Sequence, residues 1–161
     1  MLNLRLLAVV AVAIAMTAVI VVPNDNVSAT SARAGVAAPT PDKAPFFEFK
    51  GVTIGNKAEM VWQKLGEPKE KGTEQDLYVF SENESAQFYY DSARLVTAIM
   101  ITYTGDLKAA LTPLQVFGEA VEPRSDGGIN KMVRYPKAGY WISYNRSAGD
   151  DAVISIAIQK L

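Results

Sequence analysis

"MVWQKLGEPKEKG" occupies residues 60–72, and "QVFGEAVEPRSDG" occupies residues 115–127 of the same chain, 55 residues further on. At this spacing the matched pairs are Trp62 with Phe117, Glu67 with Glu122, and Pro68 with Pro123. A match at a fixed spacing is typical of repeated structure. We therefore predict two tandem repeats, residues 52–104 and residues 107–161. The alternative interpretation is two unrelated halves that share an order of elements.

The first repeat reads as one helix followed by three strands. In "TIGNKAEMVWQKLGEP", Asn56 and Glu59 have the spacing of a capping box, whereas Gly66 and Pro68 are typical of a helix end. Three runs rich in β-branched and aromatic residues follow, "DLYVFS", "AQFYYD" and "LVTAIMITY", and we predict a strand in each.

The second repeat has the same order. "LTPLQVFGE" places Thr112 as the N-cap, Pro113 at the first helical position and Gln115 three residues after the cap. The strand-like runs are "NKMVRYP", "GYWISYN" and "AVISIAIQK". Our alignment keeps the offset of 55 to Phe80 and Tyr135, and then pairs Phe88 with Ile142 and Ile99 with Ile156.

Helices followed by strands joined through short turns indicate the α+β class with antiparallel pairing. We predict an antiparallel sheet of about six strands with both helices on one face. Because side chains alternate along a strand, the sequence also predicts which residues face the helices. The expected core set is Tyr78, Phe80, Phe88, Tyr90, Ile99, Ile101, Val133, Tyr135, Ile142, Tyr144, Ile154, Ile156 and Ile158. The opposite, open face should carry Leu77, Val79, Gln87, Tyr89, Ala98, Met100, Met132, Arg134, Trp141, Ser143, Ser155 and Ala157.

Five residues of the open face belong to types that are enriched in protein interfaces. They are Tyr89, Trp141, Arg134, Met132 and Met100. We predict a protein-binding surface there. The alternative is that the aromatic side chains only cover sheet edges or pack under loops, since scattered exposed aromatic residues are common.

The N-terminal part reads as an export segment. Residues 6–22 form an apolar run after Arg5, and small residues suited to signal cleavage follow in 27–34. We predict a signal peptide or an N-terminal membrane anchor in residues 1–29, since the run is slightly long for the first and slightly short for the second. Residues 30–45, rich in Ala, Pro, Ser and Thr, are expected to be a flexible linker before a domain at 46–161. The domain should be secreted or extracytoplasmic, with membrane contact only through residues 6–22 if these are not cleaved.

Composition excludes several kinds of chemistry. The chain of 161 residues has no histidine and no cysteine, so Ser-His-Asp and Cys-His sites cannot be built from it. We expect no catalytic residue, no cofactor and no metal. The net charge of −1 gives no support for nucleic-acid binding. A carboxylate-based hydrolase of cell-wall glycans, using Glu67 and Glu122, is the enzymatic alternative.

The pattern formed by Ile54-Gly55, Val61, Leu65-Gly66 and Pro68, with the later "FYYDSARLVTAIMI", resembles the repeat unit of the SmpA/OmlA (BamE-like) and β-lactamase-inhibitor-like proteins. It is most similar to small exported YjgB-type proteins, which carry two such units. The second copy departs from the pattern, because Val121 stands where a glycine is expected, with Gly118 close by. The resemblance implies an exported protein that is no enzyme and acts by protein contact.

Two functional hypotheses follow from these observations. The first is an exported binding or inhibitor-like module whose partner is another exported or envelope protein. The second is an envelope assembly or structural protein that its N-terminal segment tethers to the membrane. Binding through the open face would favour the first.

Overall fold

The structure, a computed structural model, describes residues 42–161. The predicted signal peptide or anchor at 1–29, the apolar run at 6–22 and most of the predicted linker lie outside the described residues. The last residues of that linker already contact the domain. Ala44 is buried, its backbone N–H donates to the Tyr140 hydroxyl at 3.3 Å, and Asp42 pairs with Lys137 at 2.8 Å.

Two α-helices, two short 3-10 helices and seven strands make up the described chain. Their order and bounds are α1 (Ala58–Leu65), β1 (Glu70–Lys71), β2 (Gln75–Val79), β3 (Glu84–Tyr90), β4 (Val96–Tyr103), η1 (Leu107–Ala109), α2 (Pro113–Phe117), β5 (Ile129–Tyr135), η2 (Pro136–Ala138), β6 (Tyr140–Arg146) and β7 (Ile154–Lys160). Each predicted helix and strand is present, with ends that differ by a few residues.

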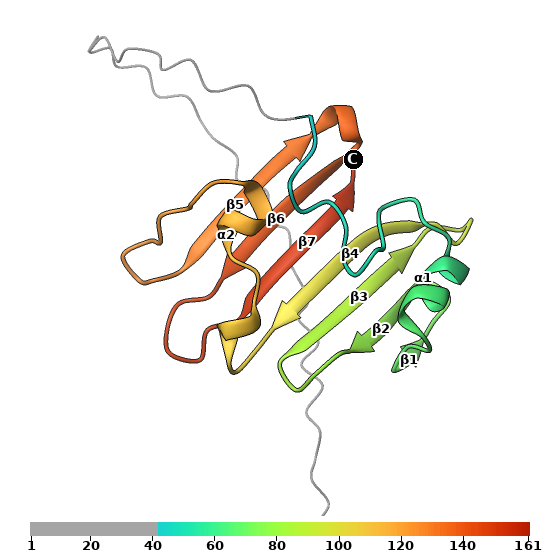
Figure 1. Ribbon diagram of the computed structural model, residues 1–161, viewed down its shortest axis with the longest axis horizontal. Coiled ribbons are helices and arrows are strands. Elements are labelled where there is room, and N and C mark those ends of the chain that lie inside the picture. The colour runs from blue at the N-terminus through green and yellow to red at the C-terminus, as the bar shows by residue number, and fades with distance from the viewer. Residues whose placement is uncertain (1–41) are drawn as a thin grey trace, which may run out of the picture. The chain divides into compact units, whose positions relative to one another are not determined.

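All seven strands belong to one antiparallel sheet, in the order β1-β2-β3-β4-β7-β6-β5 (Figure 1). The predicted α+β class with an antiparallel sheet is therefore confirmed. The sheet has seven strands where about six were expected, because the two-residue β1 pairs with the outer side of β2. The strands β4 and β7 pair in the middle and join the first three long strands to the last three in a continuous sheet.

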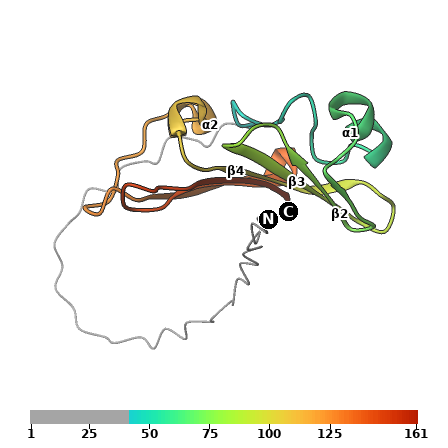
Figure 2. The same cartoon turned by 90° about the horizontal axis from the view of Figure 1, so that it is seen from below.

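The core lies between one face of this sheet and the elements that cover it. Both helices and the segment before α1 lie on that face, and no described element covers the other one (Figure 2). The predicted core set is confirmed, since all its members are buried except Phe80 and Val133, which pack against the core half-buried. Alternation along the strands thus decides which face the helices cover.

The start of α1 differs from the prediction. The helix begins at Ala58 after Lys57, and no side chain caps it. The Asn56 side chain accepts instead from the Thr53 backbone N–H at 3.0 Å, within the preceding turn. The first helical N–H, that of Ala58, donates at 2.9 Å to the Arg94 carbonyl in the β3–β4 turn. A tertiary contact therefore holds the start of the helix, where the sequence predicted a local cap.

The start of α2 agrees with the prediction. Thr112 and Gln115 form a reciprocal capping box with Pro113 in the first turn. The helix ends at Phe117, and Gly118 follows with a positive φ of 78°. Such a backbone conformation suits glycine. The helix is five residues long, three fewer than α1, because Gly118 follows the start of α2 sooner than Gly66 follows the start of α1.

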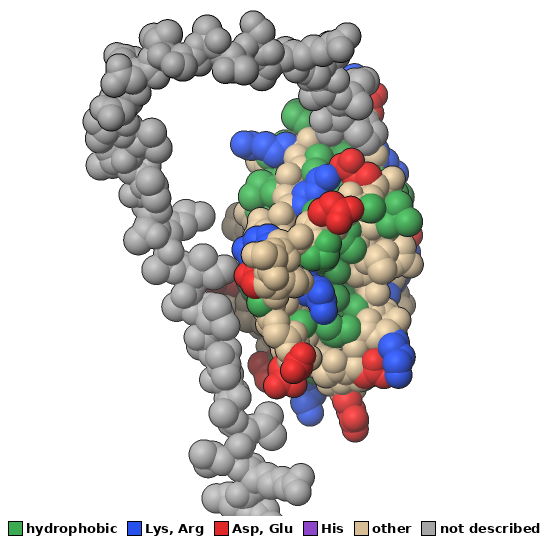
Figure 3. Space-filling model, turned by 90° about the vertical axis from the view of Figure 1, so that its left-hand side faces the viewer, with side chains coloured by type: hydrophobic (Ala, Val, Ile, Leu, Met, Phe, Trp, Pro, Cys, Tyr) green, Lys and Arg blue, Asp and Glu red, His purple; other side chains and the backbone are tan. Residues whose placement is uncertain are grey.

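The outer strand β5 carries a charged side chain toward the covered face. Lys131 lies on the same side as the buried residues of that strand, pairs with Glu119 and lies 5.4 Å from the centre of the Phe117 ring. Figure 3 looks onto the side of the molecule where β5 forms the edge of the sheet, and hydrophobic side chains are interspersed there with charges of both signs. Inward-pointing charges on an outer strand disfavour edge-to-edge pairing of sheets.

Candidate functional site

The open face of the sheet is a regular grid, because the strand registers connect residues across six strands. One row contains Gln75, Tyr89, Ala98, Gln159, Trp141 and Arg134. The next row contains Leu77, Gln87, Met100, Ala157, Ser143 and Met132. The five predicted binding residues thus lie on one face and in two adjacent rows.

These five residues differ in accessibility and do not form one contiguous cluster. Met132 is 60% exposed and Arg134 is exposed, whereas Tyr89, Met100 and Trp141 are half-buried. Three strand spacings separate Tyr89 from Trp141, which is about 14 Å. Only Ala98 and Gln159 stand between them in the row. The two aromatic side chains therefore flank a stretch of the central strands that includes small residues.

The remaining row of the grid has a different character. It contains Val79, Ser85, Thr102, Ser155, Asn145 and Asn130, of which only Val79 is apolar. Aromatic and sulfur-containing side chains therefore gather toward one end of the open face, the end that carries the turn between β3 and β4. Contact with an apolar partner surface is favoured at that end.

A β-bulge shapes the end of the face beside Tyr89. Tyr89 pairs with Ala98 and Tyr90 pairs with Val96, so Thr97 is an extra residue in β4. The Thr97 hydroxyl donates to the Tyr89 carbonyl at 3.3 Å, and the Tyr89 hydroxyl donates to the Gln87 side chain at 2.7 Å. Burial raises the pKa of Tyr89 above its usual value. Bulges are frequent beside functional sites because they redirect side chains.

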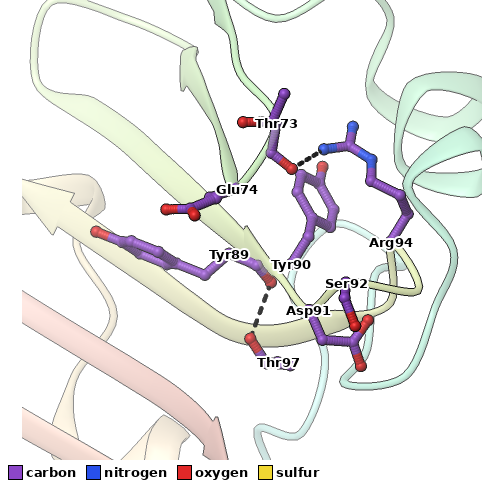
Figure 4. A pocket seen from close by; sticks show the side chains of 8 residues that line it. All are labelled: Thr73, Glu74, Tyr89, Tyr90, Asp91, Ser92, Arg94 and Thr97. Atoms are coloured by element: carbon purple, nitrogen blue, oxygen red, sulfur yellow. Dashed lines mark hydrogen bonds between the residues drawn. The ribbon is translucent and has the colours of Figure 1, made fainter.

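A pocket of about 570 Å³ opens at this bulge (Figure 4). Its wall includes Thr73, Glu74, Tyr89, Tyr90, Asp91 and Arg94. Glu74 and Tyr89 extend on one side of the pocket, Asp91 and Ser92 lie at its other end, and the Arg94 side chain reaches toward Thr73 (Figure 4). The predicted binding residue Tyr89 therefore belongs both to the open face and to the pocket.

Behind the pocket lies a buried carboxylate that the sequence analysis missed. Asp76 is 0% exposed. Its side chain accepts hydrogen bonds from Trp62 Nε1 at 2.8 Å, from the Tyr90 hydroxyl at 2.7 Å and from the Gly72 backbone N–H at 3.1 Å. Burial, followed by the hydrogen bond to Asp76, raises the pKa of Tyr90 strongly. The sequence did contain one signal for it. Asp76 lies two residues before Tyr78, so the alternation of side chains places this acidic residue on the core face of the strand.

Arg94 covers this network from the β3–β4 turn. Its backbone has a φ of 60°, in the left-handed region that non-glycine residues seldom adopt. Its guanidinium donates to the Gly72 carbonyl at 3.0 Å and to the Thr73 carbonyl, and lies 4.5 Å from the centre of the Tyr90 ring. The strained turn thus places a cation over Tyr90, and backbone strain of this kind often occurs at functional sites.

The carboxylates of the enzymatic alternative lie in ordinary surroundings. The Glu67 side chain is 83% exposed and pairs with Lys71 at 3.8 Å, and Glu122 is exposed. Asp91, which the pocket does include, accepts from the backbone N–H groups of Ala93 and Leu95 through one oxygen. Within residues 42–161, no three acidic side chains lie close enough together to hold a metal ion.

In comparisons with known proteins, no family model, no curated protein and no solved structure matches this chain. Among the helices that the structure describes, none is long and apolar enough to cross a membrane.

Proposed function

We propose that this chain is an exported, non-enzymatic protein-binding module that docks another exported or envelope protein on its open sheet face. One observation carries the proposal. The side chains of Tyr89, Trp141, Met100, Met132 and Arg134 share the face that no described element covers. Tyr, Trp, Met and Arg are the side chains that interfaces favour. The resemblance to BamE-like and β-lactamase-inhibitor-like proteins is consistent with this role.

We also infer that the two halves of the domain are copies of one ancestral unit. The register of the central strands supports this. Ile99 pairs with Ile158 and Ile101 pairs with Ile156, around a central pair formed by Met100 and Ala157. In the sequence alignment Ile99 corresponds to Ile156 and Met100 to Ala157. Matched residues therefore pair reciprocally, as a two-fold relation between copies requires.

The registers change one part of that alignment. Phe88 pairs with Ile99 in the first half, whereas Tyr144 pairs with Ile156 in the second. Under this inference the counterpart of Phe88 is Tyr144, two residues from Ile142, with which the sequence alignment matched it. The error does not alter the core assignment, because a shift by two residues keeps a side chain on the same face.

Divergence between the copies favours one docking site over two. By the same registers, the counterpart of Tyr89 is Asn145 and the counterpart of Trp141 is Ser85. The aromatic side chains therefore occupy unmatched positions and gather at one end of the face. A partner that needs both aromatic side chains can bind in only one orientation.

Export and tethering are part of the proposal. The apolar run at 6–22 and the small residues in 27–34 are the features that support them. Determination of the N-terminal residue of the protein from its native cells distinguishes the two forms. A start near Thr30 or Gly35 favours a released module, and an intact N-terminus favours the tethered envelope protein.

Affinity capture with matched variants tests the docking face. The protein as exported by its cells is immobilised and exposed to native envelope and culture proteins. We expect that a protein captured by the unsubstituted form is not captured by the Trp141→Ala variant or by the Tyr89→Ala variant. It should be retained by Leu114→Ala, which removes an exposed apolar side chain on α2, at the covered side of the sheet. Equal capture by all four forms would refute docking on the open face.

A further inference from the structure

We propose that the pocket beside Tyr89 takes a lysine or arginine side chain of the protein docked on the open face. This inference rests on the proposed function and specifies the chemistry of the partner. It starts from the continuity of two features. Tyr89 lies in the same row as Trp141 and Arg134, and it also forms part of the pocket wall. A partner that covers this row therefore reaches the mouth of the pocket.

The size of the pocket suits a side chain. At about 570 Å³ it lies within the range of roughly 300–1,000 Å³ that is typical of ligand pockets. Its walls combine the two aromatic rings of Tyr89 and Tyr90 with six polar or charged side chains, a lining that suits a ligand with both an apolar stem and a charged end. The long aliphatic stems of lysine and arginine can pack along a ring such as Tyr89 while their charged ends reach polar groups.

The charge of the lining favours a cation. Glu74 and Asp91 are acidic and Arg94 is the one basic residue of the lining, so the net charge is −1. The Asp76 carboxylate lies directly behind Tyr90 and adds a further negative charge. The Arg94 guanidinium is already bonded to two backbone carbonyls and stacked on Tyr90. An anionic ligand would face the Glu74 and Asp91 carboxylates, with the buried Asp76 carboxylate beyond Tyr90, and like-charge repulsion disfavours it.

Glu74 is the acidic group best placed to receive the cation. Among residues 42–161 its carboxylate has neither a hydrogen bond nor an ion pair, whereas one Asp91 oxygen is occupied by two backbone N–H groups. Glu74 and Tyr89 extend on the same side of the pocket (Figure 4). A cation there can pair with the carboxylate and lie against the face of the ring, two interactions that both favour lysine and arginine.

The opposite end of the row has the opposite charge. Arg134 lies on β5, four strand spacings from Tyr89, which is about 19 Å. The partner surface should therefore present a basic side chain at one end and an acidic group at the other, with apolar contact over Trp141 between them. Charges of opposite sign at the two ends select one orientation of the partner.

Binding of short peptides tests the inference directly. The exported protein, labelled with ¹⁵N, is titrated with acetyl-Gly-Arg-Gly-amide and with the same peptide carrying citrulline, which has nearly the same shape and no charge. We expect saturable amide shifts at Glu74, Tyr89 and Thr97 with the arginine peptide. Binding of the citrulline peptide should be about fivefold weaker, the loss typical of one partly exposed charge pair.

Two variants and one control complete the test. Glu74→Gln and Tyr89→Leu should each lower the affinity for the arginine peptide by about fivefold. Glu67→Gln is the same change at an exposed carboxylate outside the pocket. The affinity of this variant for the arginine peptide should stay within about twofold of that of the unsubstituted protein. The dispersion of the spectra verifies that each variant is folded. Equal binding of the two peptides, no saturable shift, or no effect of Glu74→Gln would each overturn the inference.

Failure of this inference can be separated from failure of the proposed function. If the peptide does not bind but capture of a protein still depends on Trp141, the open face docks a partner and the pocket does not take its basic side chain. If the peptide binds but capture is independent of Trp141 and Tyr89, the pocket recognises cations and docking on the open face is refuted. In the second case the inference about the partner is refuted as well.

Discussion

At the scale of single residues, the most constrained side chain is that of Asp76. A carboxylate without solvent contact is costly unless donors surround it. Here three donors, from Trp62, Tyr90 and Gly72, occupy its two oxygens. At the position that matches Asp76 in the sequence alignment, the second half of the domain has Lys131. This residue lies next to Phe117, which the alignment matches with Trp62. Both halves of the domain thus have a charged residue below the aromatic residue of the helix, with opposite sign.

Replacement of Asp76 tests how much this network stabilises the fold. Asp76→Ala leaves the Tyr90 hydroxyl and the Trp62 N–H without their acceptor, so we expect the free energy of unfolding to fall by about 3 kcal/mol. Asp76→Asn keeps one acceptor oxygen and should cost about half as much. Urea denaturation followed by circular dichroism measures both. Glu67→Gln, at an exposed carboxylate, is the control and should change stability by less than about 0.5 kcal/mol. A loss of that small size for Asp76→Ala would contradict the assigned role.

At the scale of single elements, periodicity located helices and strands well, and tertiary contacts changed their ends. The α1 helix starts where the Arg94 carbonyl accepts the Ala58 N–H, and Asn56 is used in the turn before it. The β4 strand shows a related effect. Strict alternation from Ala98 would place Val96 on the open face, but the extra residue Thr97 turns Val96 into the core, where it is 0% exposed.

A pair of identical substitutions tests the bulge. Val96→Ala removes buried methyl groups and should lower the free energy of unfolding by about 2 kcal/mol. Val79→Ala makes the same change at a residue of the open face that is 55% exposed, and should cost less than about 0.5 kcal/mol. Thermal or urea unfolding of the two variants gives the comparison. Equal losses would mean that β4 continues without a bulge and that Val96 faces outward.

At the scale of the whole molecule, the sheet is held together by pairing that the sequence left undecided. Whether the two halves of the domain form one sheet or two depends on the pairing of β4 with β7. That contact makes the open face continuous over six strands, so the aromatic residues of both halves share one surface. Six of the seven tyrosines are buried on the other side, between the sheet and its covering elements.

The burial of tyrosine predicts how stability depends on alkaline pH. Burial is the largest cause that raises the pKa of all seven tyrosines. Together with nearby carboxylates, it raises the pKa of Tyr78 and of Tyr103 to about 12. In the unfolded chain a tyrosine loses its proton near pH 10, about two units lower. The unfolded state then binds fewer protons than the folded state, so stability falls as the pH rises.

The expected pH window follows from these values. The stabilisation from Tyr78 and Tyr103 is fully present below about pH 10 and is lost between about pH 10 and pH 12, by about 1.4 kcal/mol per pH unit for each of the two. The other buried tyrosines act in the same direction. Urea unfolding at stepped pH measures the slope, and tyrosinate absorbance of the folded protein measures the ionisation. Ionisation of most tyrosines near pH 10 with the circular dichroism of the folded protein unchanged would contradict the prediction.

The sequence alone determined the order of helices and strands, the α+β class and the face of each strand that is buried. These features depend on local periods of 3.6 and 2 residues, which can be read along the chain. Only the tertiary structure decided that β4 pairs with β7, that Thr97 forms a bulge, that Asp76 is buried among donors and that Glu74 and Tyr89 share a pocket. Each of these features depends on contacts between elements, whose free energies follow from distances and burial that no local pattern specifies.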